Sequence, residues 1–153
     1  MTVYVASSWR NPVYPAVIGA LRAAGIEHYN FRDPPDRPGF GWEQVTGVDP
    51  HDLAPGERHT ETIESYLAML AHPLAKAGFR ADFDALAAAD TVVLVLPCGK
   101  SAHLELGWAV GAGKRTSILL EDPVEPDLMY RMVDHLSPDL PDLLRWLRHG
   151  GVS

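Results

Sequence analysis

Glu105 points most directly to chemistry, because it is the lone carboxylate in an otherwise apolar run at residues 102–112. The run follows a predicted buried strand at residues 91–96. A helix that is apolar on every side packs inside a protein, so we expect its single acid to lose hydration. The nearest lysines, Lys100 and Lys114, are too far along the chain to be i,i+4 partners. We interpret Glu105 as a functional carboxylate; a structural acid with a distant partner is the alternative.

The expected position of Glu105 suits nucleophilic chemistry on a sugar. The second turn of a helix favours an ionised carboxylate. An ionised, partly desolvated glutamate can attack an anomeric carbon and form a covalent glycosyl-enzyme. Asp82 is the second candidate acid, although it can equally be the N-cap of a short helix at residues 82–88. Asp90 is interpreted as a residue that starts a strand.

Hydroxyl groups and cations gather in the predicted loops. Ser7, Ser8 and Ser101 precede helices, where backbone N–H groups can bind a sugar or phosphate oxygen; simple capping is the alternative. Arg10 and Lys100 carry charges that suit a 5′-phosphate, or they are solvated loop cations.

Three aromatic residues, Trp9, Phe40 and Trp42, lie in loops rather than at periodic positions. Each can stack on a nucleobase or fill the core. Cys98 at a strand end is interpreted as a small buried side chain rather than a nucleophile, because no histidine is placed by pattern to activate it.

Two other signals are set aside. The sequence Gly-Ala-Gly-Lys at residues 111–114 ends a helix instead of opening one, which indicates a C-cap rather than a phosphate-binding loop. The histidines show no ligand spacing with a cysteine or an acid pair; those considered are His51, His59, His72, His103 and His135. No metal or redox cofactor is expected.

These residues must be positioned by alternating strands and helices. The apolar spacing predicts, in chain order, a strand at 2–6, a helix at 13–24, a strand at 26–31, a long loop at 32–58 with room for one helical turn, a helix at 60–77, a helix at 82–88, a strand at 91–96, a helix at 101–113, a strand at 115–120, a loop at 123–127, a short strand at 130–134 and a helix at 138–147 capped by Ser137.

This alternation predicts one α/β domain over residues 1–153. It is expected to be a three-layer sandwich with a parallel sheet of about five strands, flavodoxin-like or Rossmann-like. Ligands bind such sheets at the carboxyl ends of the strands, near the reversal of strand order. We therefore expect the loop at residues 7–11 to face the segment at residues 98–105.

The bulk properties narrow the class of protein. The chain has 153 residues, a net charge of −7 and no basic cluster, which makes a nucleic acid an unexpected partner. The sequence shows no apolar stretch long enough to cross a membrane and no basic leader, and its single cysteine permits no internal disulfide. A cytoplasmic enzyme is the expectation.

Three segments resemble the nucleoside 2-deoxyribosyltransferase family, which includes related nucleotide N-glycosidases. Residues 3–10, Val-Tyr-Val-Ala-Ser-Ser-Trp-Arg, resemble the first strand and its loop. Residues 82–93 resemble the stretch that leads into the central strand, and residues 105–115 resemble the catalytic helix and the strand after it. The resemblance spans nearly the whole chain in element order.

The resemblance implies roles for particular residues. Glu105 takes the place of the nucleophile that attacks C1′, Tyr4 that of the tyrosine that steadies this carboxylate, and Asp82 that of the acid that helps the base leave. The family's sugar contact before the nucleophile falls on Gly99, which is a departure; Ser101 compensates, or the 5′ side is recognised differently. Family members are commonly homodimers or larger homo-oligomers.

The predicted function is cleavage of the N-glycosidic bond of a (deoxy)nucleoside or nucleotide through a glycosyl-Glu105 intermediate, with transfer of the sugar to another base. The first alternative is a hydrolytic nucleoside 5′-monophosphate N-glycosidase. An NAD glycohydrolase and a non-catalytic nucleotide sensor are the further alternatives.

Overall fold

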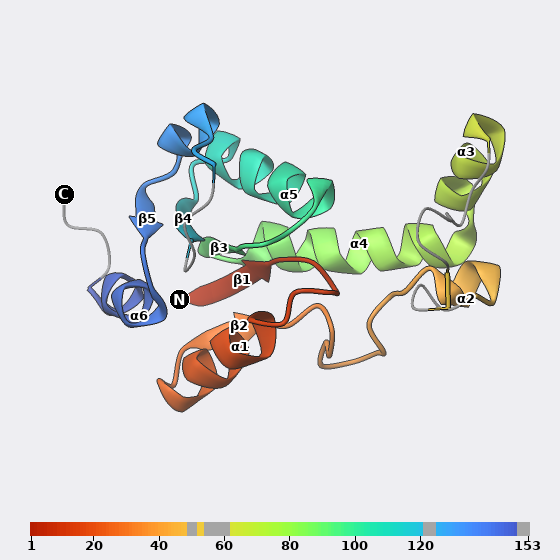
Figure 1. Ribbon diagram of the computed structural model, residues 1–153. Helices are drawn as coiled ribbons and strands as arrows, with labels where there is room; N and C mark the ends of the chain where they lie inside the picture. The colour runs from red at the N-terminus through yellow and green to blue at the C-terminus, as the bar shows by residue number, and fades with distance from the viewer. Residues whose placement is uncertain (49–51, 54–61, 121–124, 150–153) are drawn as a thin grey trace. The chain divides into compact units, whose positions relative to one another are not determined.

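The computed structural model describes residues 1–48, 52–53, 62–120 and 125–149 (Figure 1). The chain folds as two compact units. The first comprises Met1–Asn30 and Ala85–Ser153, and the second comprises Phe31–Asp84. The helical turn predicted within the long loop at 32–58 is present as α2. Residues 49–51 and 54–58 of that predicted loop lie outside the described residues.

The first unit is built on a five-stranded parallel sheet, which confirms the predicted fold class. Its strands are β1 (Thr2–Ala6), β2 (Glu27–Tyr29), β3 (Thr91–Val95), β4 (Arg115–Leu119) and β5 (His135–Ser137). Their spatial order is β2-β1-β3-β4-β5. The chain runs outward from β1 to β2 and then returns to β3, so the strand order reverses between β1 and β3. That reversal is where open α/β sheets bind ligands.

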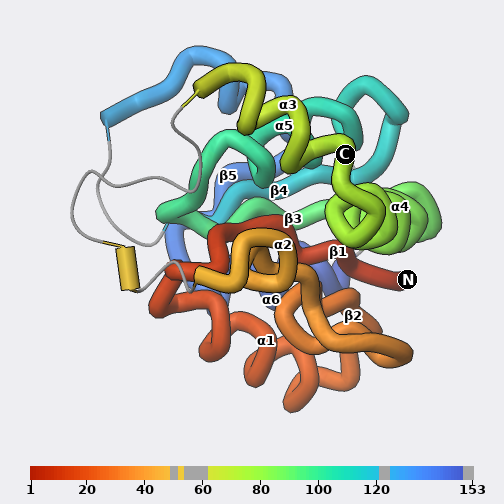
Figure 2. Tube along the Cα trace, turned by 90° about the vertical axis from the view of Figure 1, so that its right-hand side faces the viewer, coloured from red at the N-terminus to blue at the C-terminus, as the bar shows by residue number. Residues whose placement is uncertain are grey.

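Helices cover both faces of this sheet. They are α1 (Tyr14–Ala23), α5 (Lys100–Gly111) and α6 (Leu140–Arg148), and a 3₁₀ turn, η1 (Leu128–Met132), precedes β5. Both views show α1 and α6 on one side of the sheet and α5 on the other (Figures 1 and 2). The side chains of β1 and β3 are almost entirely buried, as expected for strands covered on both faces.

The second unit contains α2 (Glu43–Thr46), α3 (Ile63–Ala71) and most of α4 (Pro73–Ala88). The predicted division into helices at 60–77 and 82–88 is wrong, because the helix break falls at His72–Pro73. His72 is extended, as a residue before proline tends to be. Gly78 does not interrupt α4; a Cβ there would approach the Phe40 ring to 2.7 Å, so the glycine serves close packing.

The end of the chain also differs from the prediction. Residues 128–132 form the 3₁₀ turn, and the last strand is at 135–137 instead of 130–134. Ser137 does not cap α6, because it belongs to the sheet and its hydroxyl bonds the Ser117 hydroxyl at 3.1 Å. The cap is Asp139, whose carboxylate accepts from the Asp142 N–H at 2.7 Å.

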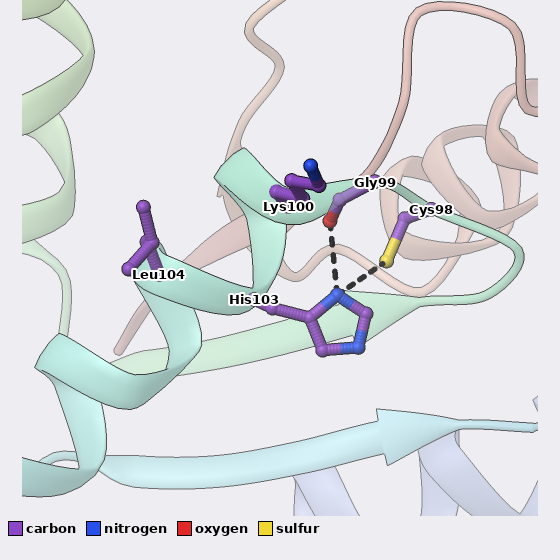
Figure 3. A pocket seen from close by; sticks show the side chains of 5 residues that line it. All are labelled: Cys98, Gly99, Lys100, His103 and Leu104. Carbon is purple, nitrogen blue, oxygen red and sulfur yellow. Dashed lines mark hydrogen bonds between the residues drawn. The ribbon is translucent and has the colours of Figure 1, made fainter.

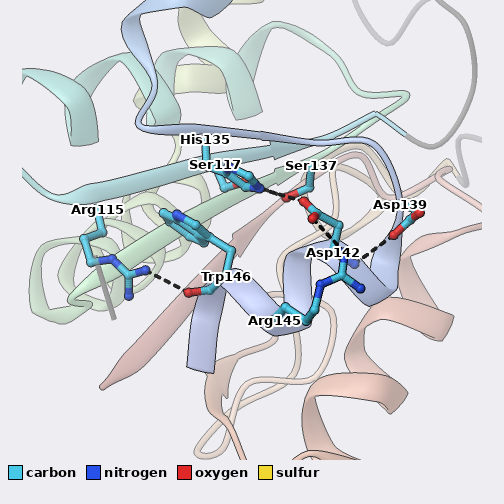
Figure 4. A network of polar contacts seen from close by, with 8 residues as sticks. All are labelled: Arg115, Ser117, His135, Ser137, Asp139, Asp142, Arg145 and Trp146. Atoms are coloured by element: carbon cyan, nitrogen blue, oxygen red, sulfur yellow. Dashed lines mark hydrogen bonds and ion pairs between the residues drawn. The ribbon is translucent and has the colours of Figure 1, made fainter. Parts of the chain in front are cut away.

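A layered cluster joins β4, β5 and α6 (Figure 4). The Arg115 guanidinium lies 4.1 Å from the centre of the Trp146 ring, and that ring system is also stacked with His135, with ring centres 5.4 Å apart. His135 Nε2 bonds the Asp142 carboxylate at 2.7 Å. This cluster fixes α6 on the outer strands of the sheet.

Helix α5 is not buried all round, contrary to the expectation from its apolar sequence. Ala102, Leu106 and Ala109 face the sheet and are buried, whereas Leu104 is 75% exposed and Trp108 is 37% exposed. The sheet covers one side of the helix only. The C-cap prediction at the other end is confirmed, since Gly113 ends the turn with a φ of 70°.

No helix among the described residues is long and apolar enough to cross a membrane.

Candidate active site

Glu105 receives a hydrogen bond from the first strand. The Tyr4 hydroxyl lies 3.1 Å from Glu105 Oε1, although the two residues are 101 positions apart in sequence. Tyr4 is 1% exposed and its ring stacks on Tyr29, so packing around the ring fixes the position of the hydroxyl. Glu105 is only partly buried, in the second turn of α5. A fixed donor and the positive end of a helix both favour the ionised carboxylate.

The Asn11 side chain connects the loop after β1 to the end of β3. Its side-chain amide donates to the Val95 carbonyl at 3.1 Å and to the Ser7 hydroxyl at 2.9 Å. The Ser7 hydroxyl in turn donates to the same carbonyl at 2.9 Å, and Asn11 Oδ1 accepts from the Val13 N–H at 2.8 Å. Because Asn11 is 2% exposed, this latch is shielded from water. These bonds fix the loop after β1 against the end of β3, and one pocket is lined by Ser8, Arg10 and Asn11 together with Cys98, as the prediction of facing loops requires.

Two surface pockets meet at Cys98. The larger, of about 590 Å³, is lined by Cys98, Gly99, Lys100, His103 and Leu104 (Figure 3). The smaller, of about 220 Å³, lies between the two loops and is lined by Ser8, Arg10, Asn11, Pro97 and Cys98. Each pocket thus contains one cation proposed for a 5′-phosphate.

Cys98 has a histidine beside it, contrary to the prediction. His103 Nδ1 lies 3.7 Å from Cys98 Sγ and 2.9 Å from the Gly99 carbonyl oxygen. A carbonyl oxygen only accepts, so Nδ1 carries the proton and does not take one from the thiol. Burial, and then the charge of Glu105, raises the pKa of the Cys98 thiol to about 11. The thiol therefore stays protonated, and its environment does not activate it as a nucleophile.

Tyr130, from η1, completes this group of residues. Its hydroxyl lies 2.9 Å from His103 Nε2, and the two rings stack with centres 5.8 Å apart. Burial is the main cause that raises the pKa of Tyr130, so the phenol remains a donor at neutral pH.

The other residues predicted for the site in the first unit occupy the same edge of the sheet. Ser8 Oγ accepts from the Arg10 N–H at 3.2 Å in a local turn, and it does not cap α1, whose N-cap is Val13. Trp9 is 50% exposed, in a position where its ring is accessible. Ser101 is exposed in the first turn of α5.

Asp82 and Trp42 belong to the second unit. Asp82 lies inside α4 and is not an N-cap; its carboxylate accepts from the Arg37 guanidinium at 3.0 Å. Trp42 precedes α2 and packs edge-to-face on Phe40, with ring centres 5.1 Å apart. Both carry side chains that a nucleoside can use, and their assignment to the site stays a prediction.

Sequence reasoning missed Asn11, His103 and Tyr130 as members of the site. The signal for His103 was its position four residues after Gly99, from which a helical side chain points back toward the helix start. Asn11 stood in the loop after the first strand, and its partners Ser7 and Val13 are local, but its bond to the Val95 carbonyl is set by tertiary structure. Nothing local marked Tyr130.

Among the described residues, no group of three or more His, Cys, Asp or Glu is arranged to hold a metal ion. One carboxylate, Glu105, accepts from a tyrosine donor, and a hydroxyl and two cations line pockets at the same edge of the sheet. This arrangement suits nucleophilic attack by Glu105 on an electrophilic carbon of a polar ligand.

The fold is shared with known structures. The 2-deoxyribosyltransferase of Bacillus psychrosaccharolyticus superposes with a TM-score of 0.61 and 16% identity, over 95% of this chain and 92% of that one. A conserved protein of Enterococcus faecalis gives 0.58 and 13%, over 97% and 98%. The CMP N-glycosidase of Clostridium botulinum gives 0.50 and 16%, over 97% and 99%. The fold expected from the resemblance is therefore confirmed.

At the level of sequence, the chain matches no protein-family model and no curated protein.

Proposed function

We propose that this protein cleaves the N-glycosidic bond of a (deoxy)nucleoside or nucleotide through a covalent glycosyl-Glu105 intermediate and transfers the sugar to another base. The observation that carries the proposal is the 3.1 Å hydrogen bond from buried Tyr4 to Glu105, at the point where the strand order reverses. The likeness in fold to a 2-deoxyribosyltransferase and a CMP N-glycosidase supports the same chemistry.

The proposed reaction has two steps at one carbon. Glu105 attacks C1′ as the bond to the base breaks, and the product is a glycosyl ester with inverted configuration. A second base then attacks C1′ from the opposite side, releases Glu105 and restores the original configuration. Tyr4 orients the carboxylate for the first step and stabilises it as it leaves in the second.

Asp82 is proposed to help the departing base, as the resemblance implies. Its partner Arg37 holds the carboxylate in one orientation, which supports a role in contacting the substrate. Trp9 and Trp42 are proposed to contact the base by stacking.

A hydrolase specific for nucleoside 5′-monophosphates is the second candidate. One observation favours it: Arg10 and Lys100 each line a pocket at the edge of the sheet that carries Glu105. With Ser8, Gly99 and Ser101, they provide donors and charge for a 5′-phosphate. Ser7 is proposed for the same site as a residue that shapes the loop, because its hydroxyl proton is already donated to the Val95 carbonyl. In this hydrolase, water replaces the acceptor base.

The test is turnover of a substrate panel. Purified protein and Glu105→Ala are incubated with deoxynucleosides, deoxynucleotides, ribonucleotides and NAD, with and without a free acceptor base, and released base is followed by chromatography. Base release that is lost in the variant supports the nucleophile. Dependence on the acceptor identifies a transferase, and release without an acceptor identifies a hydrolase.

The same panel separates the remaining functions. Nicotinamide release from NAD identifies a glycohydrolase that uses the same glutamate. Binding of a nucleotide by wild type without any turnover contradicts the enzymatic proposal and leaves a nucleotide sensor. In that sensor, Glu105→Ala weakens binding.

A further inference from the structure

The turn that opens α5 is held by side chains that the proposed reaction does not itself use. This turn, Cys98–Gly99–Lys100, contributes three of the five residues that line the larger pocket. Gly99 is the N-cap of α5 and, as a glycine, has no side chain with which to cap it. The conformation of the turn therefore depends on what binds its backbone.

His103 binds that backbone. Its Nδ1–H donates to the Gly99 carbonyl at 2.9 Å and lies 3.7 Å from Cys98 Sγ (Figure 3). An imidazole that donates through Nδ1 and is neutral accepts at Nε2. The Tyr130 hydroxyl, 2.9 Å from Nε2, supplies that hydrogen bond and thereby selects the tautomer.

We propose that His103 and Tyr130 are positioning residues that hold the Cys98–Lys100 turn in the conformation that presents the substrate's sugar to Glu105. The inference deepens the proposed function and rests on it for the identity of the ligand. The positioning of the turn itself rests on the chain Tyr130 Oη–H···Nε2 His103 Nδ1–H···O=C Gly99. Gly99 is the position where the sequence departs from the sugar contact that the resemblance implies, and it lines the larger pocket.

Because Cys98 is the only cysteine in the sequence, its reactivity can report the conformation of the Cys98–Lys100 turn even when no substrate is converted. The rate of Cys98 alkylation by iodoacetamide reports how often the turn opens, because the thiol is partly buried and protonated in the closed form. The variants are Tyr130→Phe, His103→Phe and His103→Gln. The control is Leu128→Ala, a 77%-exposed side chain in the same 3₁₀ turn as Tyr130.

Loss of the hydrogen bond to Gly99 is expected to raise the alkylation rate about tenfold in His103→Phe. Tyr130→Phe keeps the imidazole and loses only the selection of its tautomer, so its rate is expected to rise by a smaller factor. His103→Gln is expected to restore most of the wild-type protection, because its amide can donate to the same carbonyl. Leu128→Ala is expected to react like wild type. Unchanged rates in both Phe variants overturn the proposal, as does equal loss of protection in the Gln variant.

The tautomer gives a second readout. ¹⁵N NMR of the imidazole rings, with His103 assigned by its absence in His103→Gln, is expected to show a proton on Nδ1 in wild type. In Tyr130→Phe the proton is expected to distribute between the two nitrogens. A wild-type ring with its proton on Nε2 contradicts the proposed relay.

Kinetics connect the turn to the substrate. With a substrate that turns over, His103→Phe is expected to raise KM about tenfold and Tyr130→Phe by a smaller factor, and each is expected to change kcat less than about threefold. A fall in kcat at unchanged KM overturns the sugar-positioning role. If no substrate turns over, the proposed function fails, whereas alkylation and NMR still decide whether His103 and Tyr130 hold the turn.

Discussion

Glu105 acquires its chemical character from a residue 101 positions away. The carboxylate stands on a helix with an exposed face, so burial alone does not explain it. What sets it apart is the Tyr4 hydroxyl, presented by a strand whose side chains are almost all buried. In the proposed reaction, a donor that does not move keeps the Glu105 carboxylate in one geometry through both steps.

Cys98 provides a probe of the charge on Glu105. Because that charge is one of the causes that raise the thiol pKa to about 11, Glu105→Gln is expected to lower the pKa of Cys98. The fall is expected to be partial, since burial is the larger cause. The measurement is the pH profile of iodoacetamide alkylation. Glu64→Gln, an exposed acid on α3, is the control, and an identical profile for wild type and Glu105→Gln contradicts the placement of the charge.

Glu105 could be identified from the sequence because a lone acid in an apolar run is a local signal. Its contact with Tyr4 was expected from the resemblance alone and is present in the structure. Without the resemblance, Tyr4 looks like any core strand residue until the strand and helix meet. His103 illustrates the same limit. Its reach to Gly99 follows from the way helical side chains lean toward the helix start, but its reach to Tyr130 depends on the fold.

At the scale of the elements, the site depends on the latch between the loops after β1 and β3. Asn11→Ala leaves the Val95 carbonyl and the Ser7 hydroxyl with fewer partners in a buried place. We expect the free energy of unfolding to fall by about 1–3 kcal/mol, measured by urea denaturation. Ser101→Ala, which removes an exposed hydroxyl at the start of α5, is expected to change it little. If Asn11→Ala and wild type have the same free energy of unfolding, the hydrogen bonds of Asn11 do not stabilise the fold.

At the outer edge of the sheet, Asp142 is expected to make the free energy of unfolding depend on pH. The hydrogen bond from His135, and then that from Arg145, lowers the pKa of Asp142 below its ordinary value (Figure 4). A lowered pKa stabilises the fold above the ordinary carboxyl value, and this contribution is lost as the pH falls through the folded-state pKa. We therefore expect Asp142→Asn to flatten the decline in unfolding free energy below about pH 4.

The matched comparison is Asp84→Asn, an exposed acid on α4. It is expected to leave the decline in stability with falling pH as it is in wild type. If Asp142→Asn retains the wild-type pH dependence, the His135–Asp142 contact does not stabilise the fold.

Strands β1 and β3 were predictable because they are apolar runs bounded by turn residues. The errors arose where tertiary contacts overrode local signals. Gly78 indicates a helix end by type, but α4 continues past it because the Phe40 ring packs where a side chain would be. The predicted helix start at Asp82 is consequently wrong, and the structure places Asp82 inside a helix with Arg37 as its partner.

At the scale of the whole molecule, the chain folds as two units, and each holds some of the residues named in the proposal. The sheet unit holds Glu105, Tyr4 and both pockets, and the second unit holds Asp82 and Trp42. The second unit also carries α3, of whose nine residues none is buried; Ile63, Leu67 and Leu70 are 79%, 58% and 45% exposed. Exposed apolar side chains on one helix suit an interface.

We therefore expect the protein to be a homodimer or a larger homo-oligomer that buries α3. Light scattering after size exclusion should give a mass of at least twice 16.7 kDa. Leu67→Glu is expected to shift the mass toward the monomer, while Lys76→Glu, an exposed change of charge on α4, is expected to leave it unchanged. A monomeric wild type at all concentrations contradicts this expectation.

The most direct test of the central claim is mass spectrometry of the protein quenched in acid during turnover of a substrate found by the panel. The account predicts a peptide that contains Glu105 and is heavier by one bound sugar, and it predicts no such peptide and no turnover in Glu105→Gln. Turnover by wild type without a glycosylated Glu105, or turnover that survives in Glu105→Gln, would contradict it.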